Sequence, residues 1–399
     1  DYVINCYSNL DDLPNISSDY EIINYSSLEI YLNDEIENII IDNSSTFCQL
    51  IYTSGSTGNP KGIEMTFENI LSLSFDNGFY DIKDNFAQAS SMAFDASIFE
   101  IWFPLLNGAC VTIIPDPVID LSNWKKRIED NEITTAWLTS GLFNTFSDLD
   151  MTVFEQLSSI FVGGEIISPK HIKNAMRQCK ETQFYNGYGP TEATVGISHV
   201  VINDDHIGSG KSLPVGIPME NCRIKIVDED GREVEKGQKG EIVIIGPSVS
   251  KGYFKNEEKT REVFYLESTD PGLEDGTPDC LAHLRFRAYR TGDLGSIDET
   301  GNIRYAGRKD FQIKLNGYRI EIEDIENNLR KVENIRNAVV LPVYKNEKIA
   351  YLKAIVELEV ENDLGNLKNG IRIKKDLAKL IPEYMVPRNV TIIDKLPMN

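Results

Sequence analysis

Short apolar runs alternate with amphipathic stretches through the middle of the chain. The apolar runs have the length and composition of strands and lie at 47–52, 109–114, 133–138, 158–164 and 182–189. Stretches with helical periodicity follow four of them, at 66–79, 121–131, 141–149 and 168–179. Thr66 and Ser168 are suited to cap two of these helices, and Pro169 is suited to a first helical position. Strands that alternate with helices predict an α/β fold with a mostly parallel sheet.

The pattern changes after residue 212. Residues 222–246 form two β-type runs around a DEDG turn, typical of a small antiparallel sheet, and residues 266–287 have the character of an irregular acidic insertion. From residue 310 onward, two helical patterns alternate with strand-like runs, which indicates a separate small α+β domain. We therefore predict a large N-terminal core over 1–309, with layered parallel sheets and helices and an antiparallel β subdomain over about 212–309. A small C-terminal domain is predicted over 310–399.

Charge and cysteine content narrow the possible partners. The chain has 399 residues, with 40 Lys and Arg against 62 Asp and Glu, and the net charge of −22 argues against nucleic acid or an acidic membrane as a general partner. Any phosphate site must therefore be local. No apolar run approaches the roughly 20 residues that cross a bilayer. The six cysteines and four histidines are scattered, which favours reduced thiols and a cytoplasmic location over a disulfide framework or a zinc cluster.

The stretch TSGSTGNPKG, residues 53–62, follows the first apolar run. Such a loop can wrap backbone amides and hydroxyls around an anion, and Lys61 adds a positive charge. It is not a Walker A loop, because Gly62 and Ile63 follow the lysine where Ser or Thr would be needed. Taken alone, the loop leaves two readings open: an anion site and a flexible surface loop.

As a string, TSGSTGNPKG resembles the phosphate loop of the adenylate-forming enzymes, which comprise adenylation domains of nonribosomal peptide synthetases, D-alanine–carrier protein ligases, acyl-CoA synthetases and luciferases. Further segments resemble the family's motifs in the expected order: FDASIFEIW (94–102), NGYGPTEATV (186–195), GEIVIIGPSVSKGY (240–253), YRTGDLG (289–295) and GRKDFQIKLNGYRIE (307–321). The resemblance covers residues 40–399. It implies ATP and Mg²⁺ as the nucleotide and the metal.

The resemblance also implies roles for individual residues. The β- and γ-phosphates of ATP would be surrounded by Thr53, Ser54, Gly55, Ser56, Thr57, Gly58 and Lys61. Thr191 would reach the α-phosphate, and Glu192 would bind Mg²⁺, so that Lys61, Thr191 and Glu192 form the catalytic set. Adenosine would be bound by Asn186, Tyr188, Asp293 and Arg308, with Tyr188 against adenine and Asp293 on the ribose hydroxyls. Asp310 would be the hinge on which a mobile C-terminal domain turns.

The amino-acid pocket is implied by the same family. Its lining would be Asp95, Ala96, Phe99, Trp137, Phe161, Gly163, Gly187, Val195 and Gly196. Asp95 is the one charge among them, and a carboxylate in an apolar cleft needs a cationic partner, which the substrate's α-ammonium group provides. The rest of the lining is apolar and resembles valine-type pockets. We predict valine or a near neighbour, with D- or L-alanine next.

These assignments predict ATP-dependent adenylation of a small aliphatic amino acid, release of pyrophosphate and transfer to the phosphopantetheine thiol of a carrier protein or domain, as in nonribosomal peptide synthesis. One alternative is a D-alanine–carrier protein ligase, supported by Thr66 where peptide-synthetase domains commonly have His. Another is a non-catalytic fragment that acts as a binding module, because the chain stops at Asn399, before the family's usual C-terminal lysine, and lacks the usual N-terminal part. An acyl-CoA synthetase is disfavoured, since Asp95 has no purpose in a fatty-acid pocket.

Overall fold

The structure is a computed structural model that describes residues 2–5, 21–24, 47–54, 60–73, 84–114, 121–208, 212–268, 285–309, 312–345, 348–360, 365–393 and 395–396. The chain divides into two compact units, residues 1–44 and 45–399. In the first unit, strand β1 (Tyr2–Asn5) pairs in parallel with β2 (Glu21–Asn24). Every element below belongs to the second unit.

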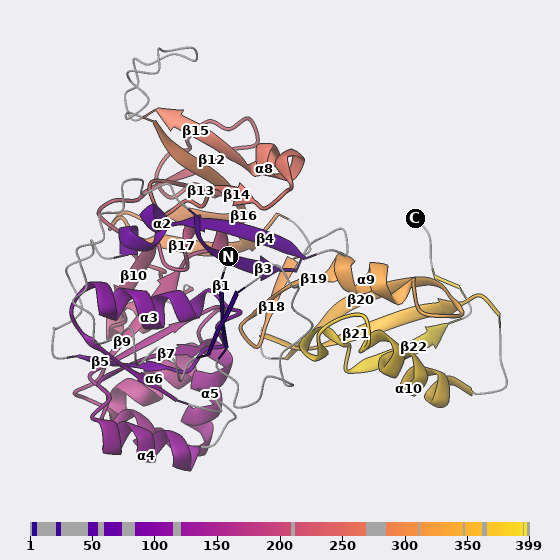
Figure 1. Ribbon diagram of the computed structural model, residues 1–399, viewed down its shortest axis with the longest axis horizontal. Helices are drawn as coiled ribbons and strands as arrows, with labels where there is room; N and C mark the ends of the chain where they lie inside the picture. The colour runs from indigo at the N-terminus through magenta and orange to yellow at the C-terminus, as the bar shows by residue number, and fades with distance from the viewer. Residues whose placement is uncertain are drawn as a thin grey trace. The chain divides into compact units, whose positions relative to one another are not determined.

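The second unit contains a seven-stranded sheet with the order β11–β10–β9–β8–β7–β5–β6, several of whose strands are labelled in Figure 1. Its strands are β5 (Asn85–Gln88), β6 (Cys110–Ile113), β7 (Thr135–Thr139), β8 (Ser159–Gly163), β9 (Gln183–Tyr188), β10 (Ser198–Val201) and β11 (Ile217–Pro218). The pairs among β6, β5, β7, β8 and β9 are parallel, and β10 and β11 continue the sheet in antiparallel fashion. The predicted α/β fold class is thus confirmed. Strand β5 was not predicted, because its four residues begin and end with an amide side chain.

Helices cover both faces of this sheet. They are α3 (Ala96–Leu106), α4 (Leu121–Asn131), α5 (Ser140–Leu149), α6 (Pro169–Gln178) and the short α7 (Asp204–Gly208). Side chains alternate across a strand, so Phe86 of β5 packs into one core with Phe99 and Phe103 of α3, while Ala87 packs into another. This second core contains Trp124 of α4 and residues of α5 and α6. Two hydrophobic cores therefore hold the sheet from its two sides.

Two antiparallel sheets accompany the parallel one. The first contains β12 (Arg223–Val227), β13 (Gly240–Ile245), β15 (Phe264–Ser268), β16 (Arg285–Ile297) and β17 (Ile303–Arg308). The second joins β3 (Phe47–Thr53), β4 (Lys61–Thr66) and β14 (Gly252–Tyr253), and helix α8 (Glu257–Val263) follows β14. The predicted turn at 228–231 indeed leads from one strand of the antiparallel sheet toward the next. Most of the predicted acidic insertion at 266–287 lies outside the described residues.

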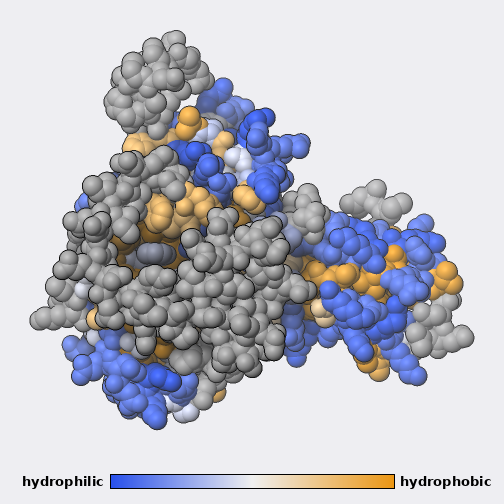
Figure 2. All heavy atoms as spheres, in the orientation of Figure 1, coloured by the Kyte–Doolittle hydropathy of each residue, from blue (hydrophilic) through white to orange (hydrophobic). Residues whose placement is uncertain are grey.

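The C-terminal part has a hydrophobic core of its own, built on the hairpin β18 (Gln312–Leu315) and β19 (Tyr318–Glu321) and on a three-stranded sheet. That sheet consists of β20 (Ile335–Lys345), β21 (Lys348–Leu358) and β22 (Asn389–Ile393), with helices α9 (Ile322–Leu329) and α10 (Gly365–Leu377). On the face drawn in Figure 2 this part is mostly hydrophilic, with a strip of hydrophobic positions. The domain division at residues 309 and 310 remains a prediction.

The helix caps test the local predictions. Thr66 caps α2 (Phe67–Ser72), since its hydroxyl accepts from the Asn69 backbone N–H and the Asn69 side chain accepts from the Thr66 N–H. Ser168 precedes α6 as predicted, but it makes no side-chain cap, because its hydroxyl is hydrogen-bonded to the ring of His171. Of the predicted helix at 66–79, residues 74–79 lie outside the described part. No helix among the described residues is both long and apolar enough to cross a membrane, and the cytoplasmic location stays a prediction.

Candidate active site

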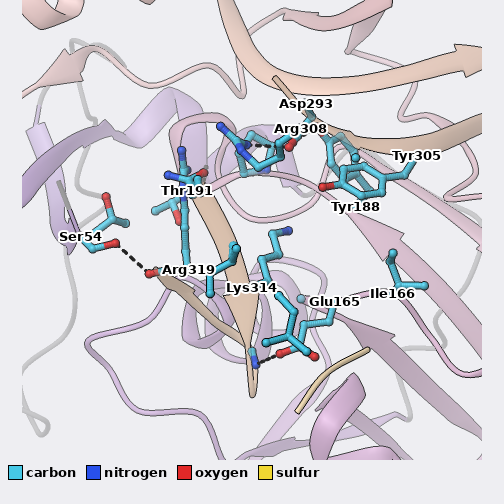
Figure 3. Close-up of a pocket in the computed structure, with 18 of the residues that line it drawn as sticks. Ser54, Glu165, Ile166, Tyr188, Thr191, Asp293, Tyr305, Arg308, Lys314 and Arg319 are labelled. Carbon is cyan, nitrogen blue, oxygen red and sulfur yellow. Dashed lines mark hydrogen bonds and ion pairs between the residues drawn. The ribbon is translucent and has the colours of Figure 1, made fainter. Parts of the chain in front are cut away.

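A cavity of about 780 Å³ brings the predicted motifs together. Its walls come from the carboxyl ends of the parallel strands, from β16 and β17, and from the β18–β19 hairpin (Figure 3). Among the lining residues are Thr53, Ser54, Asp95, Trp137, Asn186, Gly187, Tyr188, Thr191, Val195, Asp293, Arg308, Lys314 and Arg319. The carboxyl end of a parallel sheet is where ligands bind in open α/β folds. Residues that are far apart in the sequence thus share one space.

The first polar group, which we call the Asp293 cluster, comprises Tyr188, Asp293 and Arg308. The Tyr188 hydroxyl donates to Asp293 Oδ2 at 2.6 Å, and Arg308 Nη1 donates to Asp293 Oδ1 at 2.6 Å. Burial and the neighbouring Asp293 raise the pKa of Tyr188 well above its usual value, so its hydroxyl stays a donor. A carboxylate has about four acceptor positions, so Asp293 retains acceptor capacity for a ligand that enters from the cavity.

Asn186 lies next to this cluster on β9 but has a different task. Its side-chain Nδ2 donates to the Pro214 carbonyl oxygen at 2.7 Å, and the residue is buried. It therefore fixes the loop that carries Leu213 and Val215, which both line the cavity. On this geometry Asn186 shapes the predicted nucleoside site through the loop.

The second polar group, which we call the Glu192 cluster, comprises Ser54, Lys61 and Glu192. Glu192 is on a short 3-10 helix, Thr191–Ala193, and is fully buried. Tyr253 donates its hydroxyl to Glu192 Oε1 at 2.9 Å, and Arg319 Nη1 donates to Oε2 at 2.5 Å. Burial works against the charged form of Glu192, but the attraction of Arg319 and these hydrogen bonds outweigh it and lower the pKa of the carboxyl.

The other two members of the Glu192 cluster also contact the β18–β19 hairpin. Lys61 Nζ forms an ion pair with Glu321 Oε1 at 3.3 Å. Ser54 donates its hydroxyl to the Arg319 carbonyl at 2.9 Å and accepts from the Glu321 backbone N–H at 3.2 Å. The hairpin residues therefore satisfy all three members of this cluster.

Asp95 is a further acidic residue that lines the larger cavity. It precedes α3, and the Thr191 hydroxyl donates to its Oδ2 at 2.5 Å. Burial raises the pKa of Asp95, while the Thr191 hydrogen bond and the positive charge of Lys314 act in the opposite direction. Burial also lowers the pKa of Lys314, which Figure 3 shows projecting into the cavity. A carboxylate that is short of cationic partners suits an ammonium group of a ligand.

A second cavity of about 30 Å³ adjoins the first, because Trp137, Gly187, Tyr188 and Val195 line both. The remaining walls are Leu73, Phe99, Phe103, Phe161, Gly196, Ser198, His199 and Met219. Phe99 is the centre of an aromatic cluster, with its ring centroid 5.7 Å from that of Trp137 and 5.0 Å from that of Phe161. The indole of Trp137 lies so close to Gly163 that a Cβ there would be 2.6 Å from its Cη2 atom.

Many of the predicted site residues line these two cavities, but Lys61 and Glu192 of the predicted catalytic set line neither. Of the predicted amino-acid pocket, Ala96 and Gly163 line neither cavity, although Gly163 makes room for Trp137. Gly55, Ser56, Thr57 and Gly58 of the phosphate loop lie outside the described residues, as does the predicted hinge Asp310. The roles of all these residues stay predictions.

Four residues of the site were given no role by the sequence: Tyr253, Lys314, Arg319 and Glu321. All four belong to segments whose family resemblance is visible, 240–253 and 307–321. The signal was therefore present as a motif. It did not say which side chains face the predicted ATP site, because that depends on how the C-terminal hairpin meets the sheet.

The donor set at Glu192 fits Mg²⁺ held together with phosphate oxygens. Among the described residues, no group of three or more His, Cys, Asp or Glu side chains could hold a metal ion. Glu192 offers a fully buried carboxylate whose pKa is lowered, which is a hard, ionised oxygen ligand. Mg²⁺ is commonly bound by one or two carboxylates and completes its shell with phosphates and water.

Two family profiles match the sequence of this chain. The sequence profile of the AMP-binding enzymes matches residues 15–254, more than half of the chain, and that of the AMP-binding enzyme C-terminal domain matches residues 324–399. The chain belongs to the AMP-binding enzyme family. The predicted membership is thereby confirmed, and it supports the predicted AMP-forming ligase activity.

Two kinds of relative stand out. The D-alanine–D-alanyl carrier protein ligase of Listeria monocytogenes serovar 1/2a is 36% identical over 353 residues, which are 85% of this chain and 65% of the ligase. That of Lacticaseibacillus casei is 33% identical over 366 residues, 88% of this chain and 67% of the ligase. Bacitracin synthase 1 of Bacillus licheniformis is 32% identical over 385 residues, 95% of this chain but 7% of the synthase. The chain thus spans about two thirds of the length of the D-alanine ligases.

Two solved structures agree with the fold. Holo-PA1221, an NRPS protein containing adenylation and PCP domains bound to a vinylsulfonamide inhibitor, superposes with a TM-score of 0.83 at 27% identity, over 99% of this chain and 64% of that one. The fused adenylation–PCP protein NpsA-ThdA from Klebsiella oxytoca gives a TM-score of 0.81 at 25% identity, over 98% and 73% of the two chains. Adenylation domains therefore share the α/β architecture described above.

Proposed function

We propose that this AMP-binding enzyme activates a small amino acid, D-alanine before all others, as its aminoacyl-adenylate and then loads a phosphopantetheinylated carrier protein. The single observation that carries the choice of substrate is the cavity of about 30 Å³ that adjoins the larger cavity, which Asp95 lines. This cavity is far smaller than the first one of about 780 Å³. A short side chain such as that of alanine suits a small cavity better than the branched side chain of valine.

The relatives favour the same choice. Proteins named as D-alanine ligases align along about two thirds of their length at 33% and 36% identity. This supports the D-alanine alternative over valine, which the apolar lining alone had favoured. The valine expectation assumed that the three aromatic residues shrink the pocket and that Ala96, Gly163 and Gly187 leave a short apolar space. The Trp137 indole packs against Gly163, which limits the space at that glycine.

The reaction assigns a task to each part of the site. One carboxylate oxygen of the amino acid attacks the α-phosphorus of ATP, a P–O bond forms, and the bond to the β-phosphate oxygen breaks to release pyrophosphate. Asp95 binds the substrate's α-ammonium group and so aims its carboxylate at the α-phosphate. The Asp293 cluster holds the ribose and adenine. Such a reaction requires alignment and electrostatic stabilisation more than a nucleophilic side chain.

Charge on the phosphates is balanced at the Glu192 cluster. Lys61 and Ser54 bind the β- and γ-phosphates, and Thr191 reaches the α-phosphate. Glu192 is the protein ligand of Mg²⁺, which when bound neutralises phosphate charge and fixes the geometry of the polyphosphate. In the second step the carrier thiol attacks the acyl carbon, and AMP leaves.

ATP–pyrophosphate exchange with the full-length protein tests the substrate. The panel is D-alanine, L-alanine, glycine, 2-aminobutyrate and L-valine. We expect the highest kcat/KM with D-alanine, and a higher value with valine would overturn the choice. Exchange with none of the amino acids, together with intact AMP binding, would support a non-catalytic binding module.

A substitution of Trp137 tests whether this residue limits the size of the substrate. Trp137→Leu removes the indole from the cavity wall, and we expect the ratio of valine to alanine exchange to rise about tenfold or more, since each methylene of a hydrophobic pocket discriminates by roughly 1–3 kcal/mol. Phe154→Leu is the control, because Phe154 is a buried aromatic residue in the core of the other sheet face and lines neither cavity. An equal change of the ratio in both variants would contradict a role of Trp137 in substrate size.

A further inference from the structure

Glu100 is a buried acidic residue in the middle of α3, and its carboxylate binds the chain that leaves strand β5. Oε2 accepts the Ala89 N–H at 3.1 Å and the Ser90 N–H at 2.9 Å, while Oε1 accepts the Ser90 hydroxyl at 2.9 Å. Glu100 is 1% exposed. Burying a carboxylate is costly unless hydrogen bonds compensate, and here all three bonds come from these two residues. Glu100 therefore fixes the backbone at the end of β5 to the helix.

The turn at residues 89–94, which connects β5 with α3, is bound to the helix at both of its ends. At its start, Glu100 holds Ser90. Within it, the Phe94 N–H donates to the Ser91 carbonyl oxygen at 2.9 Å. At its end, the Ser97 hydroxyl donates to the Phe94 carbonyl oxygen at 2.7 Å. The conformation of the turn thus depends on side chains of α3.

This turn leads directly to the proposed ammonium-binding residue. Ala93, Phe94 and Asp95 all line the larger cavity. Asp95 stands just before the first residue of α3, where an aspartate commonly caps the helix, but its side chain makes no capping hydrogen bond. Its Oδ2 accepts the Thr191 hydroxyl instead. The position of the Asp95 carboxylate therefore depends on the backbone of the turn, not on a helix cap.

We propose that Glu100 is a positioning residue of the amino-acid site, which holds the turn at 89–94 so that Asp95 meets the ammonium group of the substrate. The inference rests on the proposed function, which gives Asp95 that task. Glu100 itself lines neither cavity and touches no reacting atom. Without its carboxylate, the N–H groups of Ala89 and Ser90 lose a buried acceptor, and the turn shifts to find another. Such a shift moves Asp95 away from the ammonium group.

ATP–pyrophosphate exchange with the full-length protein tests this role, because it gives separate KM values for D-alanine and for ATP. We expect Glu100→Ala to raise the KM for D-alanine by about tenfold or more and to leave the KM for ATP within about twofold. The reason is that the turn binds neither the Asp293 cluster nor the Glu192 cluster.

Glu100→Gln is the rescue variant, since it keeps the shape of the side chain and one acceptor oxygen. Burial raises the pKa of Glu100 to about 7 against the effect of its hydrogen bonds, so this position tolerates an uncharged group. We expect Glu100→Gln to restore the KM for D-alanine to within about threefold of the wild type.

Two analogues of alanine locate the effect within the substrate. D-alaninol keeps the ammonium group and lacks the carboxylate, whereas propionate keeps the carboxylate and lacks the ammonium group. Both are used as competitive inhibitors of exchange. In Glu100→Ala, we expect the inhibition constant of D-alaninol to rise by the same factor as the KM for D-alanine, and that of propionate to stay within about twofold. A purely structural defect would weaken both inhibitors alike or lower kcat alone.

Glu357→Ala is the matched control. Glu357 is likewise a buried glutamate that accepts a backbone N–H, that of Leu396 at 3.2 Å, and it lines neither cavity. We expect its KM values to equal those of the wild type. If Glu100→Ala does not fold, Ser90→Ala takes its place, because it removes only the hydroxyl on Oε1. This variant should raise the KM for D-alanine by about two- to threefold, and an unchanged value would contradict the inference.

The outcomes separate this inference from the proposed function. An unchanged KM for D-alanine in Glu100→Ala, an equal rise of the KM values for D-alanine and ATP, or equal weakening of the two inhibitors would overturn the role of Glu100 and leave the proposed function standing. If the wild type exchanges with no amino acid, the proposed function fails, and the role of Glu100 fails with it.

Discussion

Asp293 finds both of its partners within the segment that runs from β9 to β17, whereas Ser54, Lys61 and Glu192 all find partners in β19. The Asp293 cluster is therefore complete without the C-terminal part of the chain. The three side chains of the Glu192 cluster have these partners only when the hairpin, or a ligand in its place, is bound. In the proposed function the Asp293 cluster binds the nucleoside and the Glu192 cluster binds the polyphosphate, so the hairpin contacts lie at the polyphosphate end of the site.

The largest expected effect is a loss of AMP affinity when the Asp293 cluster is disrupted. Asp293→Ala removes the acceptor of two charge-assisted hydrogen bonds from ribose, each worth roughly 1.5–3 kcal/mol. We expect AMP affinity, measured by calorimetry, to fall by about a hundredfold or more. Pyrophosphate affinity should stay within about twofold of the wild type, because the Glu192 cluster does not use Asp293.

Asp293→Asn is the milder companion variant, since it keeps the shape of the side chain and one acceptor oxygen. It should lose less AMP affinity than Asp293→Ala. Equal losses of AMP and pyrophosphate affinity in either variant would mean that the two clusters are not independent, and unchanged AMP affinity would remove Asp293 from the ribose site.

A smaller effect concerns how the Glu192 cluster makes the free energy of unfolding depend on pH. The pKa of Glu192 lies below its ordinary value of 4.5 in the folded protein, where Arg319 and hydrogen bonds outweigh burial. Its ionised form thus stabilises the fold fully above pH 4.5, and this contribution is lost as the pH falls through the folded-state pKa. In Arg319→Ala, burial disfavours the ionised form of Glu192 without the compensating charge of Arg319. The contribution of Glu192 to the stability of the fold is therefore smaller in this variant.

Urea unfolding at pH 7 and at pH 4 measures this difference. We expect the wild type to exceed Arg319→Ala in free energy of unfolding at pH 7, and the gap to narrow by on the order of 1–2 kcal/mol at pH 4. A gap that stays constant between the two pH values would show that Arg319 stabilises the fold by packing and not through the charge of Glu192.

The two clusters also differ in how far the sequence predicted them. Tyr188, Asp293 and Arg308 lie in short motifs whose order along the chain matches the family, and the structure brings all three together. Glu192 was predicted as well, but its partner Arg319 was not, since 127 positions separate them and no spacing rule connects a sheet residue with a hairpin that arrives from elsewhere. Motifs identify such residues, while the contact between them is a property of tertiary structure.

The volume of the substrate pocket was the other property that the sequence could not predict. The paired positions of β7, β8 and β9 place Trp137 beside Phe161 and Phe161 beside Tyr185, so the predicted aromatic lining does assemble. The volume left inside depends on where the indole lies, and it lies against Gly163 at a distance that leaves no room for a Cβ. The residue types and the family resemblance predicted a pocket for valine; the packing leaves a cavity of about 30 Å³, from which the proposed function favours alanine.

The smallest expected effect sharpens the comparison at Ser54. Its hydroxyl is hydrogen-bonded to the hairpin and, by the proposed function, also serves the phosphates, so the two compete for it. Ser54→Ala therefore weakens docking and ligand binding together, and we expect the apparent pyrophosphate affinity to change by less than about threefold, because a neutral hydrogen bond contributes roughly 0.5–1.5 kcal/mol on either side. In the Arg319→Ala background the hairpin no longer competes, and the same substitution should then weaken binding by about three- to tenfold. The difference between the two backgrounds is a coupling energy between residues in contact, which a double-mutant cycle measures directly. Equal effects of Ser54→Ala in both backgrounds would mean that Ser54 serves only one of the two occupants, and the exchange of one for the other would have to rest on Lys61 and Glu192 alone.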